Sequence, residues 1–258
     1  MLQIEGVIKI FNRGSIDEKI ALQHVDLKVD KGEFVTIIGS NGAGKTTLLN
    51  AVTGSVLVDD GNVVIDGLDV THLPEFKRGR FIGRVFQNPL MGTASEMTLG
   101  ENLSMALLRG KPRGLSKGVT KNHQIIYQPI LQTLGLGLEG RLKDRVGLLS
   151  GGQRQSLAIL MATLSLPKVL LLDEHTASLD PKTATVVMDL TERVIKENGL
   201  TTLMVTHNME QAIRYGSRLV MMHEGRIILD VSGEEKSSLT IPEVVQRFGV
   251  VDEKLLLA

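Results

Sequence analysis

A glycine-rich segment directly after a run of β-favouring residues constrains the fold of this chain more than any other feature. Residues 34–38 read Phe-Val-Thr-Ile-Ile, and residues 39–47 read Gly-Ser-Asn-Gly-Ala-Gly-Lys-Thr-Thr. The stretch from Gly39 to Thr46 fits the pattern G-x-x-x-x-G-K-[ST], and a helix-like run follows from Lys45 onward. This order of strand, loop and helix predicts a phosphate-binding loop, because glycines let backbone N–H groups close around phosphate oxygens.

The residues of this loop have separate chemical roles in the predicted site. Backbone N–H groups and the positive end of the following helix dipole attract an anion. Lys45 is placed to reach the β- and γ-phosphates of a nucleotide, and the Thr46 hydroxyl is placed to hold Mg²⁺. We expect nucleotide contacts along the whole loop, which consists of Gly39, Ser40, Asn41, Gly42, Ala43, Gly44, Lys45, Thr46 and Thr47.

The composition is that of an ordinary globular protein and argues against several function classes. The length of 258 residues suits one large α/β domain or two small ones, and the residues are 42% apolar and 22% charged, as in ordinary globular proteins. Lys+Arg and Asp+Glu are equal at 29 each, so the bulk charge gives no sign of nucleic-acid binding. Without cysteine, neither a disulfide framework nor a thiolate metal site is possible. Neither a signal peptide nor a membrane-spanning apolar run is apparent, so we expect a cytosolic protein that reaches a membrane through a partner.

Strand patterns flank the loop on both sides. Alternating apolar residues at 4–11 and 21–29 predict an antiparallel hairpin, and residues 62–69 predict a second one. A helix-like run at 182–198 lies between two further strand patterns and indicates a βαβ unit. The further predicted strands are 84–86, 169–172, 202–205, 219–222 and 226–231.

The pattern becomes helical between residues 88 and 166. Leucines recur at four-residue steps over 99–107, and isoleucines and leucines form a second stripe over 126–134. We therefore predict a helical subdomain, 88–166, inserted into an α/β core. The core would comprise residues 1–87, with its β subdomain, and 167–235, followed by a short tail at 236–258.

An acidic pair supplies the second element that a nucleotide site needs. Residues 169–172 read Val-Leu-Leu-Leu, as a central parallel strand buried on both faces requires. Asp173 emerges at the carboxyl end of this strand, where ligands bind in open α/β sheets. We expect Asp173 to hold the hydration shell of Mg²⁺ and Glu174 to polarise an attacking water.

A second glycine pair precedes another helix-like segment. Residues 149–153 read Leu-Ser-Gly-Gly-Gln, and Ser150 is a good N-cap residue for the run that follows. This would be a second phosphate-receptive helix N-terminus. One nucleotide does not normally need two phosphate-receptive helix N-termini from the same side. The economical arrangement is a head-to-tail dimer, in which the Ser150 face of one copy closes over the nucleotide on the other.

These motifs together resemble the ATP-binding subunits of ATP-binding-cassette (ABC) transporters, over about residues 2–235. They stand in the family's order: Gly39 to Thr47, Gln87, Leu149 to Gln153, Val169 to Glu174, Ser178-Leu179-Asp180 and His207. The resemblance implies a single ABC ATPase domain, residues 1–258, that uses ATP and Mg²⁺. It implies an α/β fold: a P-loop NTPase (RecA-like) core with an N-terminal antiparallel β subdomain and an inserted α-helical subdomain.

The resemblance also assigns catalytic roles. Glu174 would be the general base, and His207 would be the switch histidine that contacts the γ-phosphate. Read alone, His207 is a strand-end histidine of the kind that is more often structural. Gln87, at the join of core and helical subdomain, would contact Mg²⁺ or the attacking water. The predicted metal-binding residues are Thr46, Gln87 and Asp173.

The remaining predicted nucleotide contacts follow from the same resemblance. Asp180 would belong to the loop that crosses the dimer interface. Phe11 would stack on adenine, the alternative being a phenylalanine of the hydrophobic core. The signature segment would bind the γ-phosphate across the dimer through Ser150 and Gly152, with Gly151 and Gln153 beside them.

Two positions depart from the family pattern. His175 stands where a proline usually follows the catalytic glutamate, which makes the turn less rigid and puts an extra titratable group beside Glu174. Met161 stands where an arginine is common, which puts one frequent contact in doubt but not the chemistry.

The implied function is ATP hydrolysis that energises transport through a membrane permease. A single cassette favours a bacterial importer. We expect a homodimer on the cytoplasmic side of the inner membrane, bound to integral membrane permease subunits and served indirectly by an extracytoplasmic solute-binding protein. We expect no nucleic-acid partner. Residues 173–180 and 203–209 resemble a subfamily that accompanies branched-chain-amino-acid/ribose-type permeases and is linked to aromatic amino acid uptake. The alternatives are an exporter subunit and a soluble single-cassette ATPase, such as an iron–sulfur assembly factor.

Overall fold

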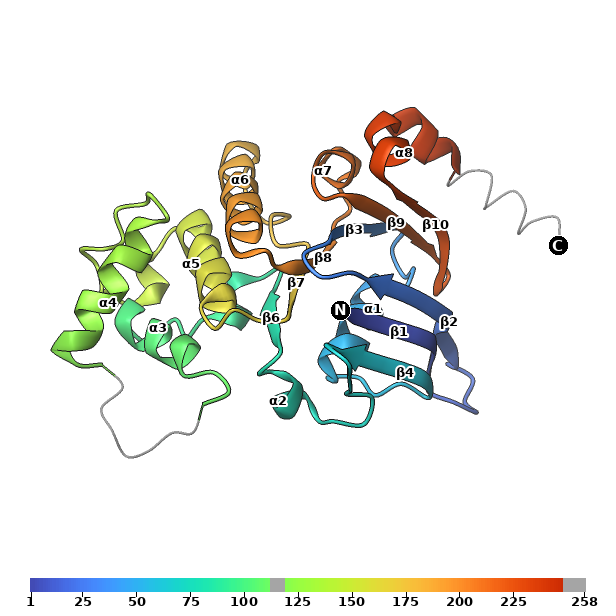
Figure 1. Cartoon of the computed structure of the whole chain (residues 1–258), viewed down its shortest axis with the longest axis horizontal. Helices are drawn as coiled ribbons and strands as arrows, with labels where there is room; N and C mark the ends of the chain where they lie inside the picture. Colours follow the sequence, from blue (N-terminus) through green and yellow to red (C-terminus); the bar gives the residue numbers. More distant parts are fainter. Residues whose placement is uncertain (112–118, 248–258) are drawn as a thin grey trace.

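The computed structural model describes residues 1–111 and 119–247, which form two sheets and a group of helices (Figure 1). One sheet has four antiparallel strands in the order β2-β1-β4-β5, and the other has six strands in the order β10-β9-β3-β8-β7-β6. Helices α3, α4 and α5 lie together on the opposite side of the six-stranded sheet from the four-stranded sheet. None of the helices in the described ranges is long and apolar enough to cross a lipid bilayer.

The four-stranded sheet contains both predicted hairpins. Its central strand β1 pairs with β2 on one side and β4 on the other. Asp66 and Gly67 both have positive φ angles, 53° and 81°, as a tight turn between β4 and β5 requires. The strand bounds are β1 (Leu2–Phe11), β2 (Lys19–Val29), β4 (Asp60–Ile65) and β5 (Leu68–Asp69).

The six-stranded sheet positions the candidate site. Its first five strands along the chain run parallel, and β10 pairs with β9 in the antiparallel direction. The carboxyl ends of β3, β8, β7 and β6 therefore meet at one edge, where ligands bind in such sheets. The bounds are β3 (Phe34–Gly39), β6 (Ile82–Val85), β7 (Val169–Asp173), β8 (Thr201–Val205), β9 (Arg218–His223) and β10 (Arg226–Ser232).

Apolar clusters hold helices on both faces of this sheet. Leu48 and Leu49 of α1 pack with residues of both sheets, such as Val35 and Val63. On the opposite face, a second apolar cluster packs α5 and α6 against β7 and β8. The helices are α1 (Lys45–Thr53), α2 (Glu75–Arg78), α3 (Leu99–Leu107), α4 (Lys121–Gln132), α5 (Gly151–Thr163), α6 (Pro181–Asn198), α7 (Met209–Arg214) and α8 (Gly233–Ser238), with 3₁₀ turns at Pro89–Gly92 and Val146–Leu148.

The second predicted helical stripe was partly wrong. Ile126 is 48% exposed on α4, whereas Tyr127 and Leu131 are fully buried against α3 and α5. The buried face is therefore shifted around the helix. A four-residue spacing fixes the period of a helix but not which of two adjacent apolar residues faces the core.

Candidate functional site

Two glycines shape the loop between β3 and α1. A Cβ atom on Gly39 would collide with the carbonyl oxygen of Met222, so the loop begins in close contact with β9. Gly44 has a φ angle of 97°, and a Cβ atom there would lie 2.5 Å from the carbonyl oxygen of Ala21. Only glycine meets both demands, because it has no Cβ and tolerates positive φ.

Lys45, the first residue of α1, folds back along this loop. Its Nζ donates hydrogen bonds to the carbonyl oxygens of Gly39, at 2.7 Å, and Ser40, at 2.9 Å. Burial lowers the pKa of Lys45, and the nearby carboxylates of Glu174 and Asp173 oppose that shift. The ammonium group is therefore held next to the loop in a partly desolvated setting, where it attracts phosphate more strongly than it would in bulk water.

One cavity of about 240 Å³ brings several of the predicted residues together. Phe11, Glu174 and the loop residues 41–47 all line it. Lys19 also lines it, and the sequence reasoning missed this residue because no motif marks it. The register of the first hairpin pairs Lys19 with Phe11, so the pairing of β1 with β2 is the signal that locates it.

Phe11 lies at the wall of this cavity and not inside the core. It is half-buried, and the Lys9 ammonium lies 5.4 Å from its ring centroid. A ring in this position has a face available to a planar ligand. The stacking role stays a prediction, and the core alternative does not fit the placement.

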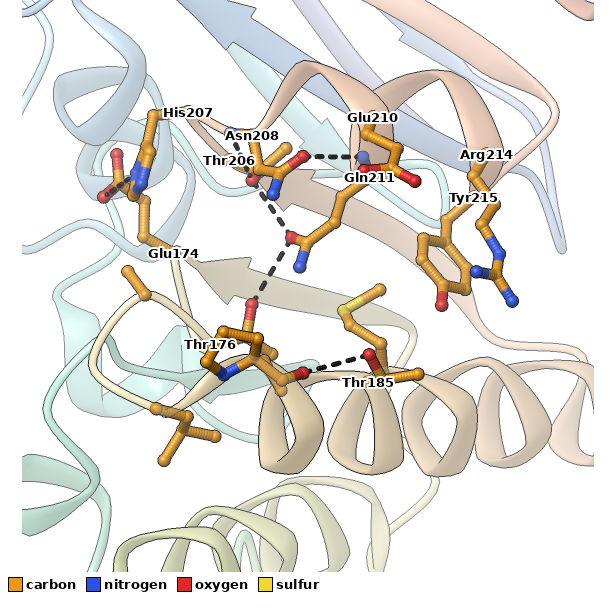
Figure 2. Close-up of a pocket in the computed structure, with 15 residues that line it drawn as sticks. Glu174, Thr176, Thr185, Thr206, His207, Asn208, Glu210, Gln211, Arg214 and Tyr215 are labelled. Atoms are coloured by element: carbon orange, nitrogen blue, oxygen red, sulfur yellow. Dashed lines mark hydrogen bonds and ion pairs between the residues drawn. The ribbon is translucent and has the colours of Figure 1, made fainter.

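Glu174 and His207 form a hydrogen-bonded pair at the ends of β7 and β8. His207 Nδ1 lies 3.0 Å from Glu174 Oε2, and Figure 2 shows the two side chains facing each other. Glu174 has a φ of 44°, a left-handed conformation that costs about 1–2 kcal/mol for a residue with a Cβ. Its backbone N–H donates to the carbonyl oxygen of Val205 at 2.9 Å, which helps to hold this turn. Strain of this kind is typical of functional sites.

Asp173 is paired with an arginine that the sequence reasoning missed. Arg84 donates from Nη2 to Asp173 Oδ2 at 2.9 Å and from Nη1 to Asn50 Oδ1 at 2.8 Å. The parallel register of β6 and β7 places Arg84 opposite Leu171, and Asp173, two residues further, points to the same face. The pairing of these strands was the missing information.

The donor chemistry fits Mg²⁺. The hydroxyl of Thr46 and the carboxylate of Asp173 are hard oxygen ligands, and they follow β3 and end β7 at the same sheet edge. Gln87 lies elsewhere on that edge and does not line the 240 Å³ cavity. Its carbonyl oxygen accepts a hydrogen bond of 3.4 Å from Ser178. Gln87, at the join of core and helical subdomain, therefore lies beside the segment that leads to Asp180.

The signature segment begins α5. Ser150 Oγ accepts from the Gln153 N–H, and Gln153 Oε1 accepts from the Ser150 N–H, which completes a capping box. Gly152 packs against Thr183 of α6, and a Cβ atom at this position would force the Thr183 side chain to shift. Asp180 caps α6 by accepting from the Thr183 N–H at 3.1 Å. Gly151 is exposed at the first turn of α5. None of residues 150–153 lines the cavity of the phosphate-binding loop in the same chain.

His175 faces away from the site, so it adds no titratable group beside the Glu174 carboxylate. The side chain is 1% exposed, and its Nε2 lies 3.3 Å from Thr191 Oγ1 on α6. Burial lowers the pKa of His175 to about 4, so the imidazole is neutral at physiological pH. Met161 is also buried, within the cluster that joins α3, α4 and α5.

The family model described as "ABC transporter" matches residues 22–177. The chain is 44% identical to the tyrosine transport ATP-binding protein of Clostridioides difficile, covering 96% of this chain and 98% of that protein. It is 33% identical to the methionine import ATP-binding protein MetN of Corynebacterium efficiens, over 96% of this chain and 67% of the relative.

Solved structures are similar over nearly the whole chain. A dimeric ATP-binding cassette in a post-hydrolysis state with ADP and Pi has a TM-score of 0.76 and 30% identity, covering 90% of this chain and 98% of that one. The ADP conformation of another transporter cassette has a TM-score of 0.79 and 29% identity, covering 96% and 98%. These similarities confirm the predicted fold class.

Proposed function

The chain belongs to the ABC transporter family as an ATP-binding subunit with ATPase activity, and from this premise we propose that it energises import of an amino acid through a membrane permease. The observation that carries the proposal is the shared cavity of Lys45 and Glu174, with His207 bonded to Glu174. A phosphate-binding cation and a carboxylate on one cavity wall are what water attack on a γ-phosphate needs.

In the proposed mechanism, the chain mostly positions and neutralises charge. Lys45 and the loop N–H groups bind the β- and γ-phosphates. Glu174 accepts a proton from the attacking water, and His207 contacts the γ-phosphate. When bound, Mg²⁺ would neutralise phosphate charge, and Thr46, Asp173 and Gln87 would hold it directly or through water.

The signature segment acts on the partner copy in this proposal. The dimeric cassette that the chain resembles supports homodimerisation. Within one chain, residues 150–153 stay away from the phosphate-binding cavity, so their exposed helix start is available to a nucleotide on a second copy. Ser150, Gly152 and the interface residue Asp180 would then complete the site across the twofold axis.

We propose that a groove beside the 3₁₀ turn at residues 89–92 receives a segment of the membrane subunit. Its volume is about 320 Å³, and it lies where β6 meets α5. Phe76 and Met91 in it are 79% and 69% exposed, and arginines flank them. Its main lining side chains are Phe76, Arg80, Arg84, Phe86, Met91 and Arg109. We assign it to a permease segment with apolar and acidic side chains.

We further propose that the helical subdomain moves relative to the core during the ATPase cycle. Helices α3, α4 and α5 share an apolar cluster that is separate from the cluster around α1, and α5 and α6 connect this cluster to the six-stranded sheet. Residues 88–166 would then move as a unit against the core of 1–87 and 167–235, with 236–258 as the tail.

The proposed solute is an aromatic amino acid. Support comes from the 44% identity to a tyrosine transport ATP-binding protein across 98% of that protein. The subunit would work on the cytoplasmic side of a bacterial membrane, with a solute-binding protein delivering the amino acid to the permease from outside.

Replacement of Glu174 by Gln tests both parts of the proposal. Glu174→Gln removes the proton acceptor but keeps the shape, so ATP turnover should fall at least about 100-fold while ATP affinity stays within about threefold. Labelled tyrosine uptake by cells that depend on this subunit should fall with it. ATPase assays, nucleotide titration and uptake make the three measurements. Full ATP turnover in Glu174→Gln would refute the assignment of Glu174 as the general base. Unchanged tyrosine uptake in a variant without ATPase activity would refute tyrosine as the solute.

A further inference from the structure

The segments that carry Glu174 and His207 are joined by a third residue, Gln211 of α7. Gln211 Oε1 accepts hydrogen bonds from Thr176 Oγ1, at 3.4 Å, and from Thr206 Oγ1, at 3.3 Å. Figure 2 shows Gln211 between the two threonines, on the wall of a cavity of about 310 Å³ that also contains Glu174 and His207. One side-chain oxygen thus links the segment that follows Glu174 to the residue that precedes His207.

The two hydroxyl groups depend on this oxygen. Thr176 and Thr206 are 7% and 4% exposed, and buried hydroxyl groups are costly without an acceptor. Loss of the Gln211 oxygen would force both segments to find new partners.

Gln211 is itself fixed by its helix. Asn208 Oδ1 caps α7 by accepting from the Gln211 N–H at 3.0 Å, and Thr206 Oγ1 accepts from the Asn208 N–H at 3.0 Å. Thr36 of β3 donates to the carbonyl oxygen of Ala212 at 2.9 Å, which anchors α7 to the sheet. Gln211 therefore acts from a rigid support that begins directly after His207.

The Glu174 turn needs such support. Its left-handed conformation is held on one side by the backbone bond to Val205. On the other side, His175 faces the core and Thr176 is bound to Gln211. The Ala177 N–H also donates to the carbonyl oxygen of Glu174 at 2.9 Å, so loss of the Thr176 attachment would weaken the support of the strained turn and let the Glu174 carboxylate shift.

We propose that Gln211 is a positioning residue that keeps the Glu174 carboxylate and the His207 imidazole in register for ATP hydrolysis. The inference rests on the proposed roles of Glu174 and His207. In this proposal, Gln211 contacts neither the nucleotide nor the attacking water, and it acts through Thr176 and Thr206. A displacement of about 1 Å at a reacting group lowers turnover by up to about 100-fold, so the effect should appear in kcat and not in KM.

Two substitutions at one position test this. Gln211→Leu removes the acceptor, and Gln211→Glu keeps an oxygen that accepts from both hydroxyl groups. We expect kcat to fall about tenfold or more in Gln211→Leu, with KM for ATP within about twofold, and to stay within about threefold of the unsubstituted protein in Gln211→Glu. Thr185→Val is the matched control, since Thr185 lines the same cavity but donates to Pro181 within α6.

A second variant, Thr176→Val, covers the case in which Gln211→Leu folds poorly, and a double-mutant cycle applies where both variants fold. Thr176→Val removes one of the two donors, so it should lower kcat by itself and add little to Gln211→Leu. Normal kcat in Gln211→Leu, or in Thr176→Val where Gln211→Leu does not fold, would overturn the inference. Equal losses in Gln211→Leu and Gln211→Glu would do the same.

Glu174→Gln separates this failure from that of the proposed function. If Glu174→Gln is inactive while Gln211→Leu turns over normally, the base stands and only the positioning role fails. If Glu174→Gln turns over normally, the base assignment fails, and with it the positioning role that depends on it.

Discussion

At the mouth of the phosphate-binding cavity, Phe11 and Lys19 lie opposite each other across the ladder between β1 and β2. The aromatic ring offers a flat apolar face, and the ammonium group of Lys19 brings positive charge to the same cavity. An adenine ring with its phosphates matches both features. In the proposed site, single residues would thus orient the nucleotide, with the base at Phe11 and the phosphates at Lys45.

Replacement of Phe11 by Ala tests this direction. Stacking of a base on an aromatic side chain contributes about 1–3 kcal/mol, so Phe11→Ala should raise the Kd for ATP about fivefold or more. The melting temperature should change little, because the ring is half-buried. Phe76→Ala, at a ring that is 79% exposed in the other groove, is the control. An unchanged Kd with a lower melting temperature would identify Phe11 as a packing residue.

At the scale of elements, helix α8 is attached to the body of the protein by a buried lysine. Lys236 is 3% exposed, and its Nζ donates to the carbonyl oxygens of Tyr215 and, at 2.8 Å, Gly216. Burial lowers the pKa of Lys236 to about 8. The anchor is therefore an amine that loses its charge in mildly alkaline solution.

This predicts a specific dependence of stability on pH. The folded pKa of about 8 lies below the ordinary value of 10.5, so between these values the unfolded chain binds more protons than the folded one. The free energy of unfolding should therefore rise with pH through this window, relative to Lys236→Met. Urea unfolding at several pH values measures the difference. Lys77→Met, at an exposed lysine of α2, should run parallel to the unsubstituted protein. A parallel curve for Lys236→Met would contradict the shift.

Elements with a strong local pattern could be predicted from the sequence, and those set by partners could not. The strand before Gly39, the strand before Asp173 and the helix at 182–198 have clear apolar periods and turn signals. The short helices α7 and α8 have only six residues each, too few for a period to show. The Arg84–Asp173 pair depends on β6 lying next to β7, a long-range choice that no local pattern contains.

At the scale of the whole molecule, the predicted site residues lie in two separate places on the chain. Lys45 and Glu174 share one cavity, whereas Ser150 lies outside it. In a twofold dimer, each complete site would take its phosphate-binding loop from one copy and its signature segment from the other. Defects in the two parts should therefore complement each other.

A mixing experiment tests this division. Lys45→Ala chains and Ser150→Arg chains should each be inactive as homodimers. An equal mixture should recover up to about a quarter of the activity, because half of the dimers are mixed and each of these has one intact site. A mixture of Lys45→Ala with Glu174→Gln is the control, since both residues belong to the same cavity and no mixed dimer has an intact site. Equal recovery in both mixtures would sink the head-to-tail arrangement.

The bonds from Lys45 to its own loop have a consequence for the working cycle. The side chain already curls around Gly39 and Ser40, so the loop holds its curvature by an internal tether. A bound triphosphate would replace the two backbone carbonyl oxygens as the hydrogen-bond acceptor of Lys45. The Lys45 ammonium is already partly desolvated by folding, so this replacement needs little further loss of water. Binding and release of the nucleotide then become the two directions of one exchange of hydrogen bonds at Lys45. This suits an ATPase that must release its products in every cycle.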